Sequence, residues 1–101
     1  ILKMSKIGVY PGTFDPMTNG HLNIIERALR VVDKLIIGIA DNLNKKPLLS
    51  IDERKSIIEN DILYLQQNNK KIEIYTVNGL LTEFAKKCNA DCIIRGLRAV
   101  S

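Results

Sequence analysis

Apolar runs alternate with amphipathic stretches from one end of the chain to the other. A short apolar run over residues 6–10 ends at a Pro-Gly pair and predicts a first strand. Apolar side chains then recur every three or four positions, which predicts an amphipathic helix over about residues 19–32. Residues 34–40 are almost all apolar, a pattern typical of a strand that is buried on both faces of a parallel sheet.

The middle of the chain predicts a loop followed by a capped helix. Residues 41–49 are polar and basic, as loops are. Ser50 and Glu53 form the pattern of a capping box, in which each side chain can bond the backbone amide of the other residue. The helix that they open has apolar positions along one face as far as Leu65.

The last third repeats the alternation. Residues 72–77 predict a third strand, residues 81–88 a third helix and residues 91–94 a fourth strand. The order is therefore β-α-β-α-β-α-β. This order predicts an α/β fold, namely a Rossmann-like open parallel sheet with helices on both faces.

The size of the chain sets the domain count. Its 101 residues have room for one domain, so we expect residues 1–101 to form a single unit. A four-stranded α/β sheet without a last helix would leave apolar surface bare, so we expect this unit to lack a C-terminal portion. We also expect the natural chain to start at Met4.

Composition and charge exclude several classes of protein. The chain is 46% apolar and 26% charged, an ordinary globular composition, and it has no apolar run of roughly 18 to 20 residues that could cross a membrane. Neither a signal peptide nor a disulfide framework is indicated, which favours a cytoplasmic protein. The net charge of +4 suits an anionic ligand, but without a Lys/Arg block it does not indicate nucleic-acid binding.

The first strand-to-helix junction is the best candidate for a site. Ligands of open α/β sheets bind beyond the carboxyl ends of the strands, and a helix N-terminus attracts phosphate. Gly12 would let a ligand approach the backbone closely, and His21, the only histidine, lies in the first turn of the helix. Alone, His21 could be an ordinary helix-surface histidine, but the adjoining loop rich in Gly, Pro, Asp and Thr favours a site.

Four stretches of the chain carry a resemblance to a known family. Residues 10–21 read YPGTFDPMTNGH, and residues 44–47, 51–54 and 94–98 read NKKP, IDER and IRGLR. The first stretch resembles the signature of nucleotidyltransferases with a T/HxGH motif. Within that superfamily the four stretches together look most like the bacterial phosphopantetheine adenylyltransferases.

The resemblance implies an enzyme of coenzyme A biosynthesis. Such an enzyme reversibly transfers AMP from ATP to 4′-phosphopantetheine, which gives dephospho-CoA and pyrophosphate by direct in-line displacement. The resemblance further implies Mg²⁺ that arrives with ATP, no assigned protein ligands for that metal, and a homo-hexamer. It also implies that further nucleotide-binding residues follow residue 101, so we expect these 101 residues alone to bind ATP poorly or to be inactive.

Individual roles follow from the same resemblance. His21 would contact the α-phosphate and stabilise the transition state, and Thr13 would hold the attacking phosphate. Lys45 would be a mobile cation that draws the two anionic substrates together, and Arg95 would bind the phosphopantetheine phosphate. The implied ATP-binding residues are Gly12, Thr13, Phe14, His21, Gly96, Leu97 and Arg98. The implied phosphopantetheine-binding residues are Thr13, Lys45, Leu81 and Arg95.

Each assignment has a structural alternative. Lys45 could be a solvated loop lysine, Arg95 and Arg98 could be surface charges, Leu81 could belong to the core, and Thr13 could shape the turn. A binding role for the two arginines is favoured because anions bind at the carboxyl ends of the strands in this architecture.

Other functions remain open at this point. A cytidylyltransferase or a nicotinamide-mononucleotide (NMN) adenylyltransferase would share the motif, and a non-catalytic nucleotide-binding module would share the fold. A flavodoxin-like redox or signalling domain would also share the architecture, but the Asp cluster of a receiver domain is missing. The KMSK at residues 3–6 resembles a tRNA-synthetase signature but precedes the histidine motif instead of following it, so we interpret it as coincidence.

Overall fold

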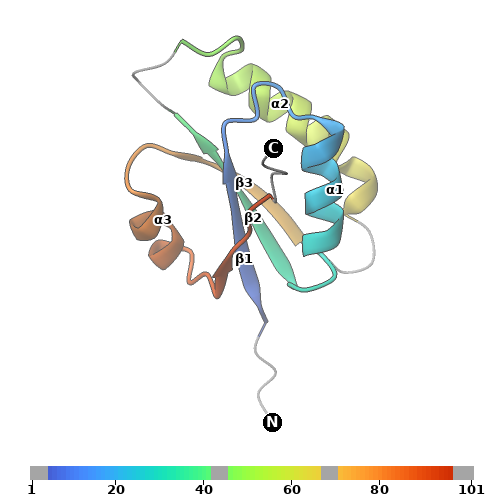
Figure 1. Ribbon diagram of the computed structural model, residues 1–101, viewed down its shortest axis with the longest axis vertical. Helices are drawn as coiled ribbons and strands as arrows, with labels where there is room; N and C mark the ends of the chain where they lie inside the picture. The colour runs from blue at the N-terminus through green and yellow to red at the C-terminus, as the bar shows by residue number, and fades with distance from the viewer. Residues whose placement is uncertain (1–4, 42–45, 67–70, 97–101) are drawn as a thin grey trace, which may run out of the picture.

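The computed structural model describes residues 5–41, 46–66 and 71–96, which form alternating strands and helices (Figure 1). The elements are β1 (Ile7–Gly12), α1 (Asn19–Ala28), β2 (Lys34–Ala40), α2 (Ile51–Asp61), the short 3₁₀ helix η1 (Leu63–Leu65), β3 (Lys71–Val77), α3 (Leu81–Lys87) and β4 (Cys92–Ile93). The predicted order of strands and helices is confirmed. None of the helices within these ranges has the length and apolar character needed to span a bilayer.

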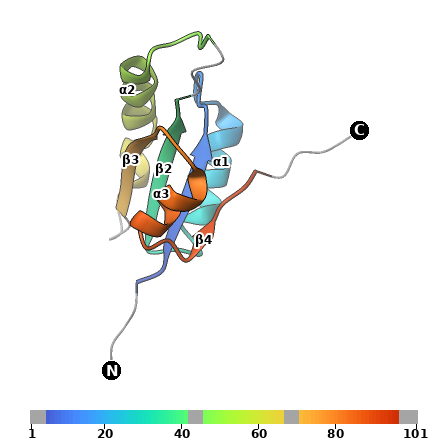
Figure 2. The same ribbon diagram turned by 90° about the vertical axis from the view of Figure 1, so that its left-hand side faces the viewer.

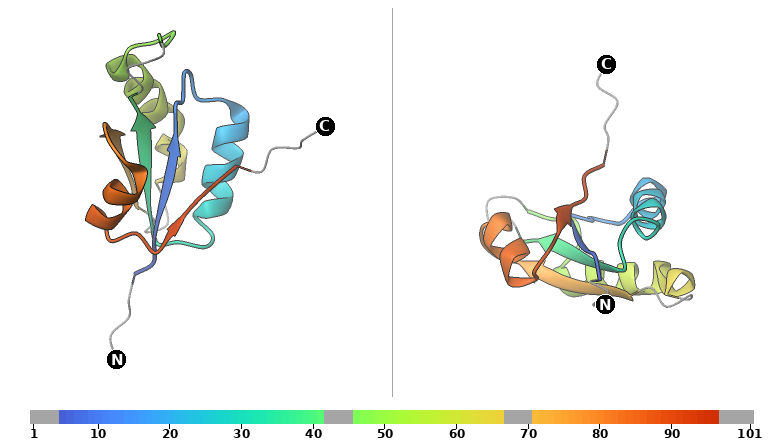
Figure 3. Two further views of the ribbon diagram at one scale, coloured as in Figure 1. Left: turned by 60° about the vertical axis from the view of Figure 1, so that its left-hand side comes forward. Right: turned by 90° about the horizontal axis from the view of Figure 1, so that it is seen from below.

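The four strands form one parallel sheet in the order β3-β2-β1-β4. The chain moves outward from β1 to β2 and β3, then returns to place β4 on the other side of β1. Because such crossovers are right-handed, this reversal puts α1 and α2 on one face and α3 on the other (Figures 2 and 3). The predicted Rossmann-like sheet with helices on both faces is confirmed, and the strand order reverses beside β1.

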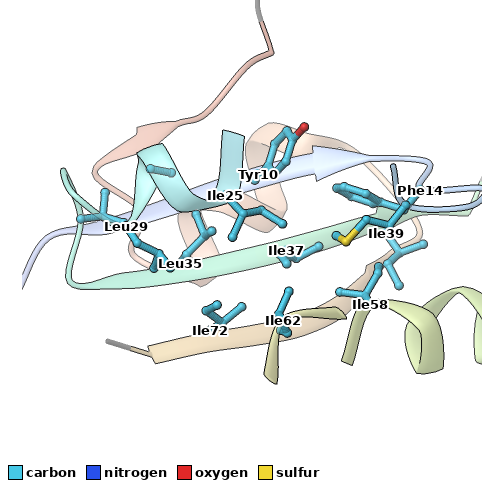
Figure 4. Packing of buried hydrophobic residues seen from close by; sticks show 13 residues of the cluster. Tyr10, Phe14, Ile25, Leu29, Leu35, Ile37, Ile39, Ile58, Ile62 and Ile72 are labelled. Atoms are coloured by element: carbon cyan, nitrogen blue, oxygen red, sulfur yellow. The ribbon is translucent and has the colours of Figure 1, made fainter. Parts of the chain in front are cut away.

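The main core lies between the sheet and the helices α1 and α2 (Figure 4). Alternate residues of β2 point to this face, and Leu35, Ile37 and Ile39 are all 0% exposed. Ile25 of α1 and Ile58 of α2 pack into the same cluster and are equally buried. Burial of these side chains is the main source of stability for the fold.

The opposite face of the sheet is covered by α3. Val9 and Ile36 belong to this face and are buried. A Cβ on Gly38 would lie 2.8 Å from Cγ2 of Val77 and 3.4 Å from the ring of Phe84. Glycine at this position therefore leaves room for β3 and α3 side chains to close over the end of β2.

The helices α1 and α2 each begin with a capping box. At α2, the amide of Glu53 donates to Ser50 Oγ (3.1 Å), and the amide of Ser50 donates to Glu53 Oε1 (2.9 Å), as predicted. These hydrogen bonds stabilise the carboxylate, so the pKa of Glu53 lies below its usual value. At α1, Thr18 and His21 take the same two positions.

The bounds of several elements differ from the sequence-based prediction. The first strand does not stop before the Pro-Gly pair, because its pairing with β2 continues to Gly12 opposite Ile39. The first helix ends at Ala28 instead of residue 32, since the amide of Arg30 already donates to Arg27 in a turn. The second helix ends at Asp61 and is followed by η1 instead of running on to residue 65.

The fourth strand is also shorter than expected. It contains Cys92 and Ile93, which pair with Gly8 and Val9. Asp91 precedes the strand, where its carboxylate accepts a hydrogen bond from the amide of Ile7 (2.8 Å) and its own amide donates to the Ile7 carbonyl (2.7 Å). Asp91 thereby fixes the start of β4 against the start of β1.

Candidate active site

A pocket of about 560 Å³ opens at the carboxyl ends of β1, β2 and β3, on the α3 face of the sheet. We name it the Thr13 pocket. Its lining residues are Pro11, Gly12, Thr13, Gly38, Ala40, Asp41, Val77, Asn78, Gly79 and Leu81. Open α/β sheets bind ligands at this edge, so the position agrees with the general rule for the fold.

A second pocket of about 540 Å³ lies on the α1 side of β1, where the strand order reverses. We name it the His21 pocket. Its lining residues are Tyr10, Thr18, Gly20, His21, Asn23, Ile24, Arg27 and Gly96. The last residues of β1 thus contribute to two hollows, one on each face of the sheet.

The His21 ring completes the capping box of α1. The backbone amide of Thr18 donates to His21 Nδ1 (2.9 Å), and the amide of His21 donates to Thr18 Oγ1 (3.3 Å). An imidazole nitrogen that accepts from an amide cannot carry a proton itself. The proton of the neutral ring is therefore on Nε2, which faces away from the cap as a hydrogen-bond donor.

Aromatic packing holds the same ring in place. The Phe14 ring centre lies 4.9 Å from that of His21 and 5.3 Å from that of Tyr10, edge to face with the tyrosine. Burial against these rings lowers the pKa of His21 below its usual value of 6.5, because it penalises the charged form. His21 is thus a neutral, oriented donor at neutral pH.

The turn that follows β1 brings the backbone close to any ligand of the Thr13 pocket. Thr13 is exposed, and Gly12 beside it is partly buried. A Cβ on Gly12 would lie 3.0 Å from the Phe14 ring, so a larger residue would push against that ring. A side chain at this position would fit only if the Phe14 ring moved by a few tenths of an ångström.

The expectation that Phe14 binds ATP needs correction for its side chain. The ring is 1% exposed and packs in the core, so it has no surface to offer a nucleotide. Phe14 also has a left-handed backbone, with φ of 50°. Its ring supports His21, and only its backbone is left for a ligand.

Some of the other predicted site residues lie within the residues that the structure describes, and some lie outside them. Gly96 lines the His21 pocket together with His21 itself, so these two predicted residues are brought together. Arg95 is exposed two residues after the end of β4 and lines neither of the two pockets. Lys45, Leu97 and Arg98 lie outside the described residues.

Leu81 lies at the Thr13 pocket. It is the first residue of α3, is partly buried, and lines the Thr13 pocket with Val77. Thr13 and Leu81, both predicted to bind phosphopantetheine, therefore share one pocket. A core role for Leu81 is compatible with this, since a half-buried leucine can pack and line a pocket together.

Metal ligands were not assigned from the sequence. Among the described residues, no group of three or more His, Cys, Asp or Glu side chains could hold a metal ion. Among the described residues that line the Thr13 pocket, Asp41 is the one with a carboxylate. One carboxylate suits a Mg²⁺ ion that is bound mainly by substrate phosphates and water.

Two further residues organise the site and were not given a role from the sequence. The Asp15 carboxylate accepts from the amides of Leu48 (2.6 Å) and Leu49 (2.8 Å), which ties the β1–α1 loop to the β2–α2 loop. Arg54 of α2 donates to the carbonyl of Thr13 (3.0 Å). Each contact joins residues more than 30 positions apart, so no local spacing could have signalled it.

We predict that Asp15→Asn loosens the β2–α2 loop. The amide side chain loses the charge and one of its two acceptors, so unfolding should become easier by about 1–3 kcal/mol. Hydrogen exchange at the amides of Leu48 and Leu49 should speed up by about tenfold or more, as measured by NMR. Glu59→Gln, an exposed change on α2, is the control. Unchanged exchange at both amides in Asp15→Asn would contradict this role.

Comparison with known proteins supports a single family. The family model described as cytidylyltransferase-like matches residues 9–101. This match covers most of the chain, including both pockets.

Curated relatives with one common name are similar to the chain. It is 51% identical over 96 residues to a phosphopantetheine adenylyltransferase of Caulobacter vibrioides, a match covering 95% of this chain and 58% of the relative. It is 55% identical to a phosphopantetheine adenylyltransferase of Wolbachia sp. subsp. Drosophila simulans, covering 95% of this chain and 55% of the relative. The chain therefore spans little more than half the length of these relatives.

A solved structure shares the fold. It is a bifunctional NMN adenylyltransferase/ADP-ribose pyrophosphatase from Francisella tularensis, crystallised with AMP and a manganese ion. The two share 30% identity with a TM-score of 0.64, over 82% of this chain and 25% of the other.

Proposed function

Because the chain belongs to the cytidylyltransferase-like family, we propose that its protein transfers an adenylyl group from ATP to 4′-phosphopantetheine. A phosphate oxygen of phosphopantetheine attacks the α-phosphorus of ATP. The new P–O bond forms as the bond to the β-phosphate oxygen breaks, and pyrophosphate leaves. The products are dephospho-CoA and pyrophosphate, and the reaction is reversible. Curated relatives named for this activity share about half of their residues with the chain over the matched region.

The state of His21 is the observation that carries the proposal. Its Nδ1 is occupied by the amide of Thr18, so Nε2–H is the donor that remains. In-line phosphoryl-type transfer needs positioning and charge stabilisation, not a nucleophile from the protein. A neutral imidazole N–H held at a helix N-terminus can donate to the negative charge that grows on the α-phosphate.

The Thr13 pocket supports the choice of acceptor. Val77 and Leu81 give it an apolar wall, while Thr13 and Asn78 add polar groups. This combination suits a flexible pantetheine arm that ends in a phosphate. Thr13 would hold that phosphate at the end of β1, with Arg95 and Lys45 as the cations that bind it.

The His21 pocket supports the choice of donor. His21 and Gly96 would bind the triphosphate side of ATP with Leu97 and Arg98, and the backbone of Gly12, Thr13 and Phe14 would complete this contact. Arg27 adds a positive charge to the same pocket. Mg²⁺ would enter on the ATP phosphates and neutralise part of their charge.

The resemblance extends the proposal to location and assembly. A cytoplasmic location would supply ATP, and a homo-hexamer is the assembly that the resemblance implies. Size-exclusion chromatography with light scattering tests the assembly. The expected result is a mass six times that of the protomer.

Substrate choice tests the proposed function. The complete gene product should release pyrophosphate when ATP and 4′-phosphopantetheine are both present. Pantetheine, which lacks the phosphate, should not replace the acceptor, and CTP should not replace ATP. Faster turnover with CTP, or with NMN as the acceptor, would assign the protein to another activity of the same family.

We predict a pH dependence that follows from His21. Its pKa is lowered below 6.5, so the neutral ring that activity needs is present at pH 7 and is lost as the pH falls through that lowered value. The free energy of unfolding should also rise as the pH rises toward 6.5. The reason is that the unfolded chain binds the proton of His21 more readily than the folded chain does. Histidine titration by NMR should give a midpoint under 6.5. A midpoint above 6.5 would contradict the prediction.

A further inference from the structure

Arg54 is a charged side chain in the interior of the protein. The residue is 2% exposed. Among the described residues it is the one charged or polar residue that is buried. Removing a guanidinium from water is costly unless its N–H groups are satisfied. A residue buried at such a cost must be held by specific contacts.

Within the described residues, the hydrogen-bond partners of this side chain are backbone carbonyls. Nη1 donates to the carbonyl oxygens of Thr13 (3.0 Å) and Ala40 (3.3 Å), and Nε donates to that of Ser50 (3.4 Å). Thr13 follows the end of β1 and Ala40 ends β2, so one guanidinium joins the ends of both strands from α2. The ion pair found among the described residues, Lys34–Glu73, does not involve Arg54.

The bond to Thr13 fixes the direction of the peptide that links Thr13 to Phe14. This peptide is trans, so its N–H points opposite to its carbonyl. With the carbonyl directed at Arg54, the Phe14 amide is directed away from α2. No described residue accepts a hydrogen bond from that amide.

The backbone at this point is also strained. Phe14 has φ of 50°, a conformation that a bulky residue adopts only when its surroundings hold it there. Its buried ring holds one side of the turn and Arg54 holds the other. Without Arg54 the peptide would be free to turn to a more relaxed conformation.

We propose that Arg54 is a positioning residue that holds the Thr13–Phe14 peptide with its N–H turned toward the anionic substrate. This inference rests on the proposed function and deepens it. Arg54 touches no substrate in this role. It acts through the backbone of the turn between the two pockets.

Substitution of Arg54 in the complete gene product tests the proposal. Arg54→Met keeps the length of the side chain and removes all of the donors, so kcat should fall by about tenfold or more. Arg54→Lys keeps the charge but cannot reach three carbonyls in a planar fork, so its loss should be smaller. Lys55→Met, an exposed change at the next position of α2, is the matched control and should retain the parent rate.

A readout on the peptide itself separates positioning from general stability. In the parent, addition of ATP should shift the NMR signal of the Phe14 amide, and in Arg54→Lys that shift should shrink while the melting temperature stays within a few degrees. A parent protein without turnover would contradict the proposed function. An active parent together with an Arg54→Lys variant of unchanged kcat and unchanged Phe14 shift would overturn the role of Arg54, even if Arg54→Met fails to fold.

Discussion

Replacement of His21 by alanine should lower kcat for dephospho-CoA formation by about 10²–10³-fold. The imidazole is the one side chain of the His21 pocket whose protonation is fixed by a backbone contact, through the amide of Thr18 at 2.9 Å. A donor aimed in advance at growing charge contributes most in the transition state and little to ground-state binding. The KM for ATP should therefore change much less than kcat.

Loss of the cap must be separated from loss of the donor. His21→Ala also removes a capping contact, so unfolding should become easier by about 1 kcal/mol. Thr18→Ala removes the capping hydroxyl, which also lies 3.1 Å from His21 Nδ1, but keeps the imidazole and the backbone amide that donates to it. Asn23→Ala, an exposed change in the same pocket, is the matched control and should retain the parent rate. If Thr18→Ala lowers kcat as much as His21→Ala, the effect is one of helix stability, and the catalytic role of His21 is wrong.

Replacement of Ile37 by alanine should lower the free energy of unfolding by about 2–5 kcal/mol. Ile37 is 0% exposed at the centre of β2, where α1 and α2 both pack on the sheet. Truncation removes three carbons from a side chain in the core cluster between the sheet and the helices α1 and α2, and it leaves a cavity there. Urea denaturation followed by circular dichroism measures the change.

An exposed leucine is the matched control. Leu63 of η1 is 64% exposed, so Leu63→Ala should change the free energy of unfolding by no more than about 0.5 kcal/mol. Equal losses in Ile37→Ala and Leu63→Ala would contradict the assignment of the core to the α1 and α2 face.

Most of the fold could be predicted because the local spacing of apolar and polar residues indicates each strand and helix. The apolar run over residues 34–40 coincides with β2, since a strand buried on both faces leaves no ambiguous positions. The predicted end of α1 was wrong because Leu29 and Val32 continue the apolar spacing of the helix although both lie beyond its last residue, Ala28. Both side chains are nevertheless buried. The apolar spacing of a helix therefore continues past Ala28 because these positions face the core, not because they are helical.

The residues that line the pockets could be proposed from the motifs of the sequence, but the long-range contacts that hold the loops could not. Thr13 and His21 fall in one motif, and the structure places each in a pocket at the end of β1. Asp15 and Arg54 act on residues 33 to 41 positions away. Their side-chain types say nothing about such partners, so only the folded chain could identify them.

Transfer of a label from ATP tests the central claim most directly. ATP labelled at the α-phosphate should be incubated with 4′-phosphopantetheine and the complete gene product, and the products should then be separated. We predict that the label moves to dephospho-CoA, that His21→Ala slows this transfer by at least a hundredfold, and that none of it becomes attached to the protein. Label that stays on ATP, or a His21→Ala variant as fast as the parent, would contradict the account.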